Sequence, residues 1–156
     1  MSAPTVLVLQ GPNLDLLGSR EPEIYGRETL AGLQARLDGV AQQLQVRLVH
    51  TQSAHEGVLI ERVHAAAREG IIGAVVNAAA YTHTSIALRD AFLATRLPFV
   101  EVHLSNPRAR EPFRHTSLLA DLAIGVVEGF GPMGYELALR GLLARLGAGI
   151  PPTGRV

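Results

Sequence analysis

The chain alternates between short runs of apolar residues and longer segments in which apolar residues return every three or four positions. Residues 5–9 form an apolar run that ends at Gly11 and Pro12, which predicts a first strand. The next apolar residues share one side of a helix, and they are Leu30, Leu33, Leu37, Val40 and Leu44. The same change of period repeats along the chain. It predicts further strands at residues 46–50, 72–76 and 98–103, and a fifth within 118–127.

Capping residues and a proline mark where some of the intervening helices begin. They are Ser53 and Glu56 in the spacing of a capping box, Thr84 or Ser85 before a helix to about residue 95, and Pro132 before a helix over residues 133–146. Strands that alternate with helices indicate an α/β protein with a parallel sheet and right-handed crossovers. We therefore expect a flavodoxin-like three-layer sandwich, with five parallel strands in the order 2-1-3-4-5 and helices on both faces. Residues 1–147 would form one domain, and residues 148–156, rich in glycine and proline, a flexible C-terminal tail.

Composition excludes several classes of function. The chain has 156 residues, 47% of them apolar, which suits one domain with its own core. Its 14 basic and 14 acidic residues balance, which disfavours a nucleic-acid partner. No run is apolar and long enough for a membrane span, and no signal peptide is recognisable, so a cytoplasmic protein is expected. The sequence lacks cysteine and lysine, which excludes thiolate nucleophiles, cysteine-ligated zinc, Schiff-base chemistry and the usual phosphate-binding P-loop.

Polar side chains follow the first strand, at the edge of the sheet where open α/β proteins bind ligands. This loop contains Asn13, Arg20 and Tyr25, and a nearby guanidinium favours the phenolate form of a tyrosine. Arg20 and Tyr25 could equally face solvent as ordinary loop residues. Glycines bound residues 18–26, and we expect this segment to act as a lid that closes over the site.

The fourth strand ends in Glu101 and His103, which are two residues apart and therefore share one face of the sheet. There the carboxylate can orient the imidazole and support it electrostatically. A lone histidine at a strand end is more often structural than catalytic, but Asn77 and His83 follow the neighbouring strand. We therefore expect His103 to be catalytic.

Four groups of residues, in this order along the chain, resemble type II 3-dehydroquinate dehydratase over residues 6 to about 146. They are Gly-Pro-Asn-Leu-Asp-Leu-Leu-Gly-x-Arg-Glu-Pro-x-x-Tyr-Gly from Gly11, Gln-Ser-x-His-Glu-Gly from Gln52, Tyr-Thr-His-Thr-Ser-x-Ala-Leu-Arg-Asp from Tyr81, and Glu-Val-His-Leu-Ser-Asn from Glu101 with Arg-Glu-x-Phe-Arg-His from Arg110. The resemblance implies dehydration of 3-dehydroquinate to 3-dehydroshikimate, by anti-elimination through an enolate, with no metal or other cofactor. The missing lysine agrees with it, because the unrelated type I enzymes work through a lysine Schiff base.

The resemblance also implies a role for each matching residue. Tyr25 would be the base, Arg20 would stabilise the transition state, and His103 would be the acid. Glu101 would orient His103, and Asn13 would position a water that stabilises the enolate. The substrate-binding residues would be Asn77, His83, Leu104, Ser105, Arg114 and, from a neighbouring subunit, Asp90. The family assembles as a dodecamer built from trimers, so the same homo-oligomer is expected.

Three residues depart from the family pattern. Asp15 and Ala54 stand where asparagine is usual, and Ala78 stands where proline is usual. Asp15 would add negative charge near an anionic substrate, unless it faces a helix end or Arg20. Two other classes of function stay open. One is a binding module whose ligand binding survives Tyr25→Phe, and the other is a related dehydratase or isomerase for another polyhydroxylated carboxylate.

Some polar residues have plainer explanations. Asp90 could instead form a structural ion pair with Arg89 or Arg96. His55 begins like the helix of a zinc protease, but the residue four positions on is Leu59 rather than histidine, so that motif is absent.

Overall fold

The computed structural model describes residues 2–19, 21–25 and 27–149, with Tyr25 described by its backbone alone. Parallel strands form one sheet in the order β2-β1-β3-β4-β5, which confirms the predicted topology. The strands are β1 (Thr5–Gln10), β2 (Arg47–Gln52), β3 (Gly73–Asn77), β4 (Phe99–His103) and β5 (Gly125–Glu128). The α-helices are α1 (Pro22–Tyr25), α2 (Leu30–Gln43), α3 (Glu56–Arg68), α4 (Ile86–Thr95) and α5 (Met133–Leu146). Four 3₁₀ helices are also described, η1 (Leu14–Leu16), η2 (Ala79–His83), η3 (Pro107–Ala109) and η4 (Pro112–Arg114).

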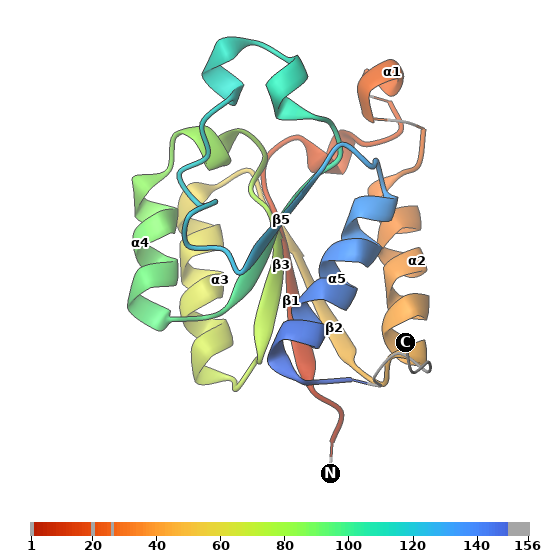
Figure 1. Cartoon of the computed structure of the whole chain (residues 1–156), viewed down its shortest axis with the longest axis vertical. Helices are drawn as coiled ribbons and strands as arrows, with labels where there is room; N and C mark the ends of the chain where they lie inside the picture. Colours follow the sequence, from red (N-terminus) through yellow and green to blue (C-terminus); the bar gives the residue numbers. More distant parts are fainter. Residues whose placement is uncertain (1, 20, 26, 150–156) are drawn as a thin grey trace.

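Helices cover both faces of the sheet. Figure 1 shows α3 and α4 on one face and α2 and α5 on the other. Side chains alternate along a strand, so on β1 Val6 and Val8 pack with α2 and α5, whereas Leu7 and Leu9 pack with α3 and α4. All four side chains are fully buried. This double burial explains why the strand appears in the sequence as a continuous apolar run.

The helix starts follow the sequence signals in two cases and depart from them in one. Helix α5 has the predicted bounds, and Ser85 caps α4 because its hydroxyl accepts the Leu88 N–H at 2.9 Å. The expected capping box is wrong, since α3 begins at Glu56 and its N-cap residue is His55. Ser53 Oγ instead accepts the His55 N–H at 3.0 Å, so the hydroxyl stabilises the turn before the helix.

The end of the chain differs slightly from expectation. Strand β5 extends to Glu128, one residue beyond the predicted stretch. The first residues of the expected tail pack against α5, with the Ala148 N–H donating to the Leu143 carbonyl at 3.0 Å. Residues 150–156 lie outside the described part of the chain. Within that part, none of the helices has both the length and the apolar character needed to cross a bilayer.

Candidate active site

Two cavities of about 480 and 260 Å³ lie at the carboxyl end of the sheet. They share His83, His103, Pro107 and Arg114 as lining residues, so the two cavities are adjacent. Pro107 and Arg114 come from η3 and η4, which lie in the segment that covers the upper end of the sheet in Figure 1. This is the edge at which open α/β proteins bind ligands.

Glu101 and His103 meet on one face of β4, as the alternation of the strand predicted. His103 Nε2 donates to Glu101 Oε2 at 3.0 Å, and Ser117 Oγ donates to Glu101 Oε1 at 2.5 Å. Glu101 has no exposed surface and His103 is 8% exposed. Two hydrogen bonds to the carboxylate compensate for its burial and hold the imidazole in one orientation at the cavity wall.

His83 lies next to His103 on the wall that the two cavities share. The two rings are stacked, with centroids 6.5 Å apart and planes inclined by 17°. His83 Nδ1 donates to the Thr116 carbonyl at 2.8 Å, so Nε2 is the acceptor of the neutral ring. His83 can therefore accept a hydrogen bond from a ligand hydroxyl.

The loop after β1 approaches β3 closely enough to require glycine. The Gly11 N–H donates to the Asn77 carbonyl at 2.8 Å, and a Cβ at position 11 would lie 2.3 Å from the Ala78 carbonyl oxygen. The loop then brings Asn13 to the wall of the smaller cavity, in the left-handed region with φ of 70°. Asparagine tolerates this conformation better than most residues, and its side chain makes no capping bond to η1. Its amide can therefore bind a ligand or a water.

The remaining wall combines backbone, hydroxyl and guanidinium groups. Leu104, Ser105 and Asn77 line the smaller cavity, and Arg114 lines both. Arg114 Nε donates to the carboxylate of Glu111, and this hydrogen bond holds the pKa of Glu111 below its usual value. An anionic ligand would compete with Glu111 for the same guanidinium.

The remaining predicted site residues are Arg20, Tyr25 and Asp90. Arg20 and the side chain of Tyr25 lie outside the described part of the chain. Asp90 is exposed on α4 and lines neither cavity. The suggested ion pair of Arg89 with Asp90 is not the one found, because Arg89 Nη1 lies 2.5 Å from Asp121 Oδ1.

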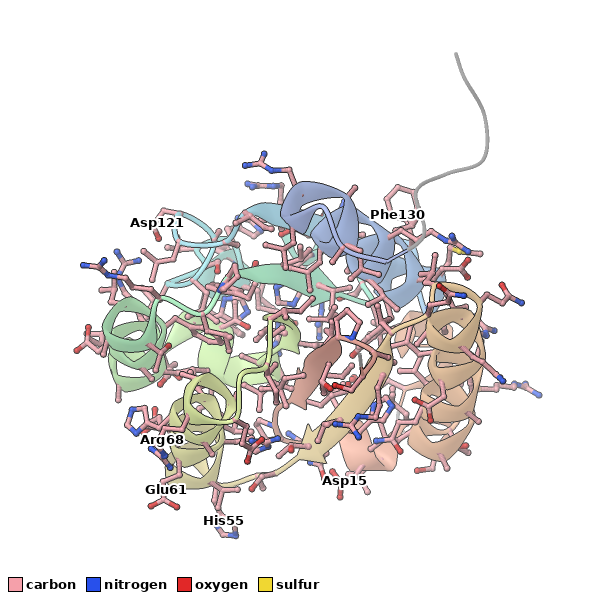
Figure 2. The ribbon with its side chains drawn as sticks, turned by 90° about the horizontal axis from the view of Figure 1, so that it is seen from below. Asp15, His55, Glu61, Arg68, Asp121 and Phe130 are labelled. Carbon is pink, nitrogen blue, oxygen red and sulfur yellow. The ribbon has the colours of Figure 1, made fainter. Side chains whose placement is uncertain are left out.

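The three departures from the family pattern lie off the cavity walls. Asp15 is exposed at the outer edge of the molecule (Figure 2), with Gln52 Nε2 3.5 Å from its carboxylate. Ala54 is exposed, and its carbonyl accepts the Tyr81 hydroxyl at 2.7 Å. Ala78 is buried beside the first loop. These positions therefore give no support to a different substrate.

Two residues that the sequence pattern did not predict for the site lie beside Glu101 and His103. Ser117 holds Glu101, and Glu128 lies opposite His103 in the β4–β5 register and lines the larger cavity. One ligand atom each from Glu101, His103 and Glu128 lie within 4.8 Å of one another, so these three could hold a divalent cation. Glu128 sits one residue beyond the predicted fifth strand, and the alternation of that strand was the signal that could have found it.

A histidine that lines a polar cavity with an arginine, and that is hydrogen-bonded to a buried carboxylate, is suited to acid–base chemistry on a small anionic molecule. The fold and the site thus define an acid–base enzyme of the open α/β class.

Comparison with known proteins identifies the family. A family profile described as Dehydroquinase class II matches residues 4–143. A 3-dehydroquinate dehydratase of Marinobacter nauticus is 56% identical over 142 residues, which cover 91% of this chain and 97% of that protein. A type II dehydroquinase structure from Propionibacterium acnes has a TM-score of 0.87 at 40% identity, covering 92% of this chain and 98% of that one. A second, from Butyrivibrio crossotus, has a TM-score of 0.88 at 38% identity, covering 90% and 97%. The chain belongs to the class II dehydroquinase family.

Proposed function

We propose that the two adjacent cavities at the carboxyl end of the sheet form the active site. There the chain, a type II 3-dehydroquinate dehydratase of the shikimate pathway, removes water from 3-dehydroquinate. The observation that carries the proposal is His103 on the cavity wall with its hydrogen bond to the buried Glu101. The reaction is a reversible anti-elimination through an enolate, and its product is 3-dehydroshikimate. In this proposal no metal or organic cofactor takes part.

His103 is the acid that protonates the departing hydroxyl group, and Glu101 orients it. Tyr25 is the base that removes the proton beside the carbonyl, and Arg20 stabilises the transition state. An acid and a base on opposite faces of the ring suit an anti-elimination. The burial of Glu101 and the fixed orientation of His103 support the acid half of this assignment. The base half rests on the family resemblance of residues 11–26.

The other lining residues bind the substrate. Asn13 positions the water that stabilises the enolate, and Arg114 attracts the negative charge of the substrate. The carboxylate and hydroxyl groups are bound by Asn77, His83, Leu104 and Ser105 together with Arg114.

Asp90 belongs to the site of a neighbouring subunit in this proposal. It is exposed on α4 and shares one face of that helix with Ile86 and Leu93, which are 64% and 50% exposed. Exposed apolar side chains beside Asp90 favour a subunit contact there. The proposed assembly is a dodecamer built from trimers, and a monomer in sedimentation would remove Asp90 from the site. Cell fractionation would test the cytoplasmic location that the sequence led us to expect.

The decisive experiment follows the ultraviolet absorbance of the conjugated product when purified protein meets 3-dehydroquinate. Turnover should survive a chelator and borohydride treatment, and it should collapse in Tyr25→Phe and in His103→Ala. Matched controls are Tyr81→Phe and His55→Ala, of which His55 projects outward at the edge of the molecule in Figure 2. Both controls should keep wild-type turnover.

Two results would overturn the proposal. One is a folded wild-type protein without turnover, and the other is undiminished turnover in His103→Ala. Ligand binding that survives Tyr25→Phe in a protein without turnover would indicate a binding module instead.

A further inference from the structure

A buried hydrogen-bonded chain runs behind the cavity wall from β1 through α5 to β3. Tyr135 Oη donates to Gln10 Oε1 at 2.5 Å, and Asn77 Nδ2 donates to Tyr135 Oη at 2.9 Å. Gln10 and Asn77 are opposite each other in the β1–β3 register, and Tyr135 comes from the first turns of α5. The exposed fractions of the three residues are 1%, 3% and 0%. Of these, only Asn77 lines a cavity.

We infer that Tyr135 and Gln10 are positioning residues that fix the amide of Asn77 so that it offers an N–H donor to an oxygen atom of the substrate. The inference deepens the proposed function, because it rests on the substrate-binding role proposed there for Asn77. It adds two residues that do not touch the substrate and assigns the direction of the Asn77 hydrogen bond.

The orientation of the amide follows from the atoms on either side of it. Asn77 Oδ1 accepts the Ala79 N–H at 3.1 Å. A flipped amide would place Nδ2 against that N–H, so two donors would face each other. Oδ1 therefore stays on Ala79, and Nδ2 has to face Tyr135.

The direction of the chain follows from the single proton of the phenol. Burial raises the pKa of Tyr135, so its hydroxyl remains protonated at neutral pH. Tyr135 accepts from Asn77 and has one proton left, which it gives to Gln10. The three side chains thus hold each other in one arrangement.

This arrangement leaves one donor for a ligand. Asn77 Nδ2 carries two hydrogens, and within the described part of the chain only one of them has a protein acceptor. Because Asn77 lines the smaller cavity, the second hydrogen can meet a carboxylate or hydroxyl oxygen of the substrate. An amide that could flip would present its oxygen there for part of the time, and that oxygen would repel a carboxylate.

The buried end of the chain can reverse. Gln10 Nε2 is buried and has no hydrogen-bond partner among the described residues. In Asn77→Asp both carboxylate oxygens are acceptors, so Tyr135 would donate to Asp and a flipped Gln10 would donate to Tyr135. This variant should keep the hydrogen bond to Tyr135 while it loses the donor at the cavity and gains a negative charge.

The test is a set of steady-state measurements of KM and kcat with 3-dehydroquinate. Asn77→Ala should raise KM about tenfold or more, since a hydrogen bond to a charged group is worth about that factor. Tyr135→Phe should raise KM about threefold to tenfold and leave kcat within about twofold. Asn77→Asp should raise KM at least as much as Asn77→Ala, because it also places a negative charge against an anionic substrate.

A positioning role predicts that the two effects are not additive. In the Asn77→Ala background, Tyr135→Phe should change KM no further, because there is no amide left to orient. Gln10→Leu removes the acceptor of the Tyr135 hydroxyl and should raise KM. Gln10→Glu keeps that acceptor, so its KM should be near wild type. Tyr81→Phe is the matched control, since it loses one hydrogen bond to a backbone carbonyl away from the cavities.

The possible outcomes test the substrate-binding role of Asn77 and the positioning role of Tyr135 separately. An unchanged KM in both Asn77→Ala and Asn77→Asp removes Asn77 from the proposed substrate site. A raised KM in Asn77→Ala with wild-type KM in Tyr135→Phe overturns the positioning inference alone. The positioning inference is also overturned if Tyr135→Phe raises KM by the same factor with and without Asn77, because that result indicates a general structural effect.

Discussion

Replacing Glu101 by glutamine should separate the stability of the protein from its catalytic rate. The substitution keeps the shape of the side chain and removes its charge. In the structure the carboxylate accepts from His103 Nε2 on one oxygen and from Ser117 Oγ on the other. An amide can accept at only one of these two sites.

Ser117 decides which site keeps its acceptor. Its hydroxyl oxygen already accepts the N–H groups of Leu119 and Ala120, at 3.1 and 3.0 Å, so the hydroxyl has to donate to residue 101. The amide oxygen of Gln would therefore face Ser117, and the amide nitrogen would face His103. A doubly protonated imidazole would then place N–H against N–H. The variant should favour a neutral His103 with its lone pair on Nε2 and its proton on Nδ1, and a neutral imidazole is a much weaker acid than an imidazolium.

The expected magnitude follows from the lost interaction. A hydrogen bond to a charged group contributes about 1.5–3 kcal/mol. If the transition state loses that amount, kcat should fall about tenfold to a hundredfold, since each 1.36 kcal/mol is about a factor of ten. The free energy of unfolding should change by less than about 1 kcal/mol, because a neutral amide avoids the cost of burying a charge.

The assay is initial rates at saturating 3-dehydroquinate, measured by product absorbance, together with urea denaturation of the same samples. Glu69→Gln is the matched control, since Glu69 is an exposed partner of Arg62 at the end of α3. A kcat within twofold of wild type, or a rate loss explained entirely by unfolded protein, would refute the role given to the Glu101 carboxylate.

Three further predictions concern the close backbone contact at Gly11, the surface ion pair of Asp121, and Glu128 beside His103. Gly11→Ala should destabilise the protein by about 1–3 kcal/mol or more in urea denaturation, because its Cβ would lie 2.3 Å from the Ala78 carbonyl oxygen; an unchanged midpoint would contradict the close approach. The hydrogen bond from Arg89 lowers the pKa of Asp121 below its ordinary 3.8, so its stabilising effect is present above about pH 4 and is lost as pH falls through the folded-state value. The melting temperature of Asp121→Asn should therefore be below wild type at pH 7, and the difference should disappear in acid as Asp121 becomes protonated; an equal deficit at both pH values would count against the ion pair. Glu128→Gln should lower kcat about twofold to tenfold, because it removes a negative charge within 4.8 Å of the His103 ring, and a kcat equal to wild type would show that this charge is screened.

The parts of the fold and site that the sequence predicts are those governed by local periodicity. Two-residue alternation along a strand is enough to place Glu101 and His103 on one face of the sheet. The succession of strands and helices likewise predicts the order of the sheet, and so brings Asn77 beside the end of β1.

The parts that could not be predicted depend on contacts between distant or irregular segments. Ser117 lies in a stretch without regular periodicity, so nothing in the pattern linked it to Glu101, sixteen positions earlier. Glu128 was missed because the predicted bounds of the fifth strand stopped one residue too soon. The Ser53 capping box was wrong because a turn competed for the same hydroxyl, and spacing alone cannot distinguish the two uses.

The contact between Tyr135 and Gln10 also bears on the order in which the protein is made. These residues are 125 positions apart, and Tyr135 belongs to the last helix of the fold. While the chain is still leaving the ribosome, the sheet strands that carry Asn77 and His103 are synthesised before the helix that fastens Asn77. The Asn77 Nδ2 group should therefore lack its acceptor until α5 docks, so a chain that ends before this helix should lack tight substrate binding even where its strands have paired.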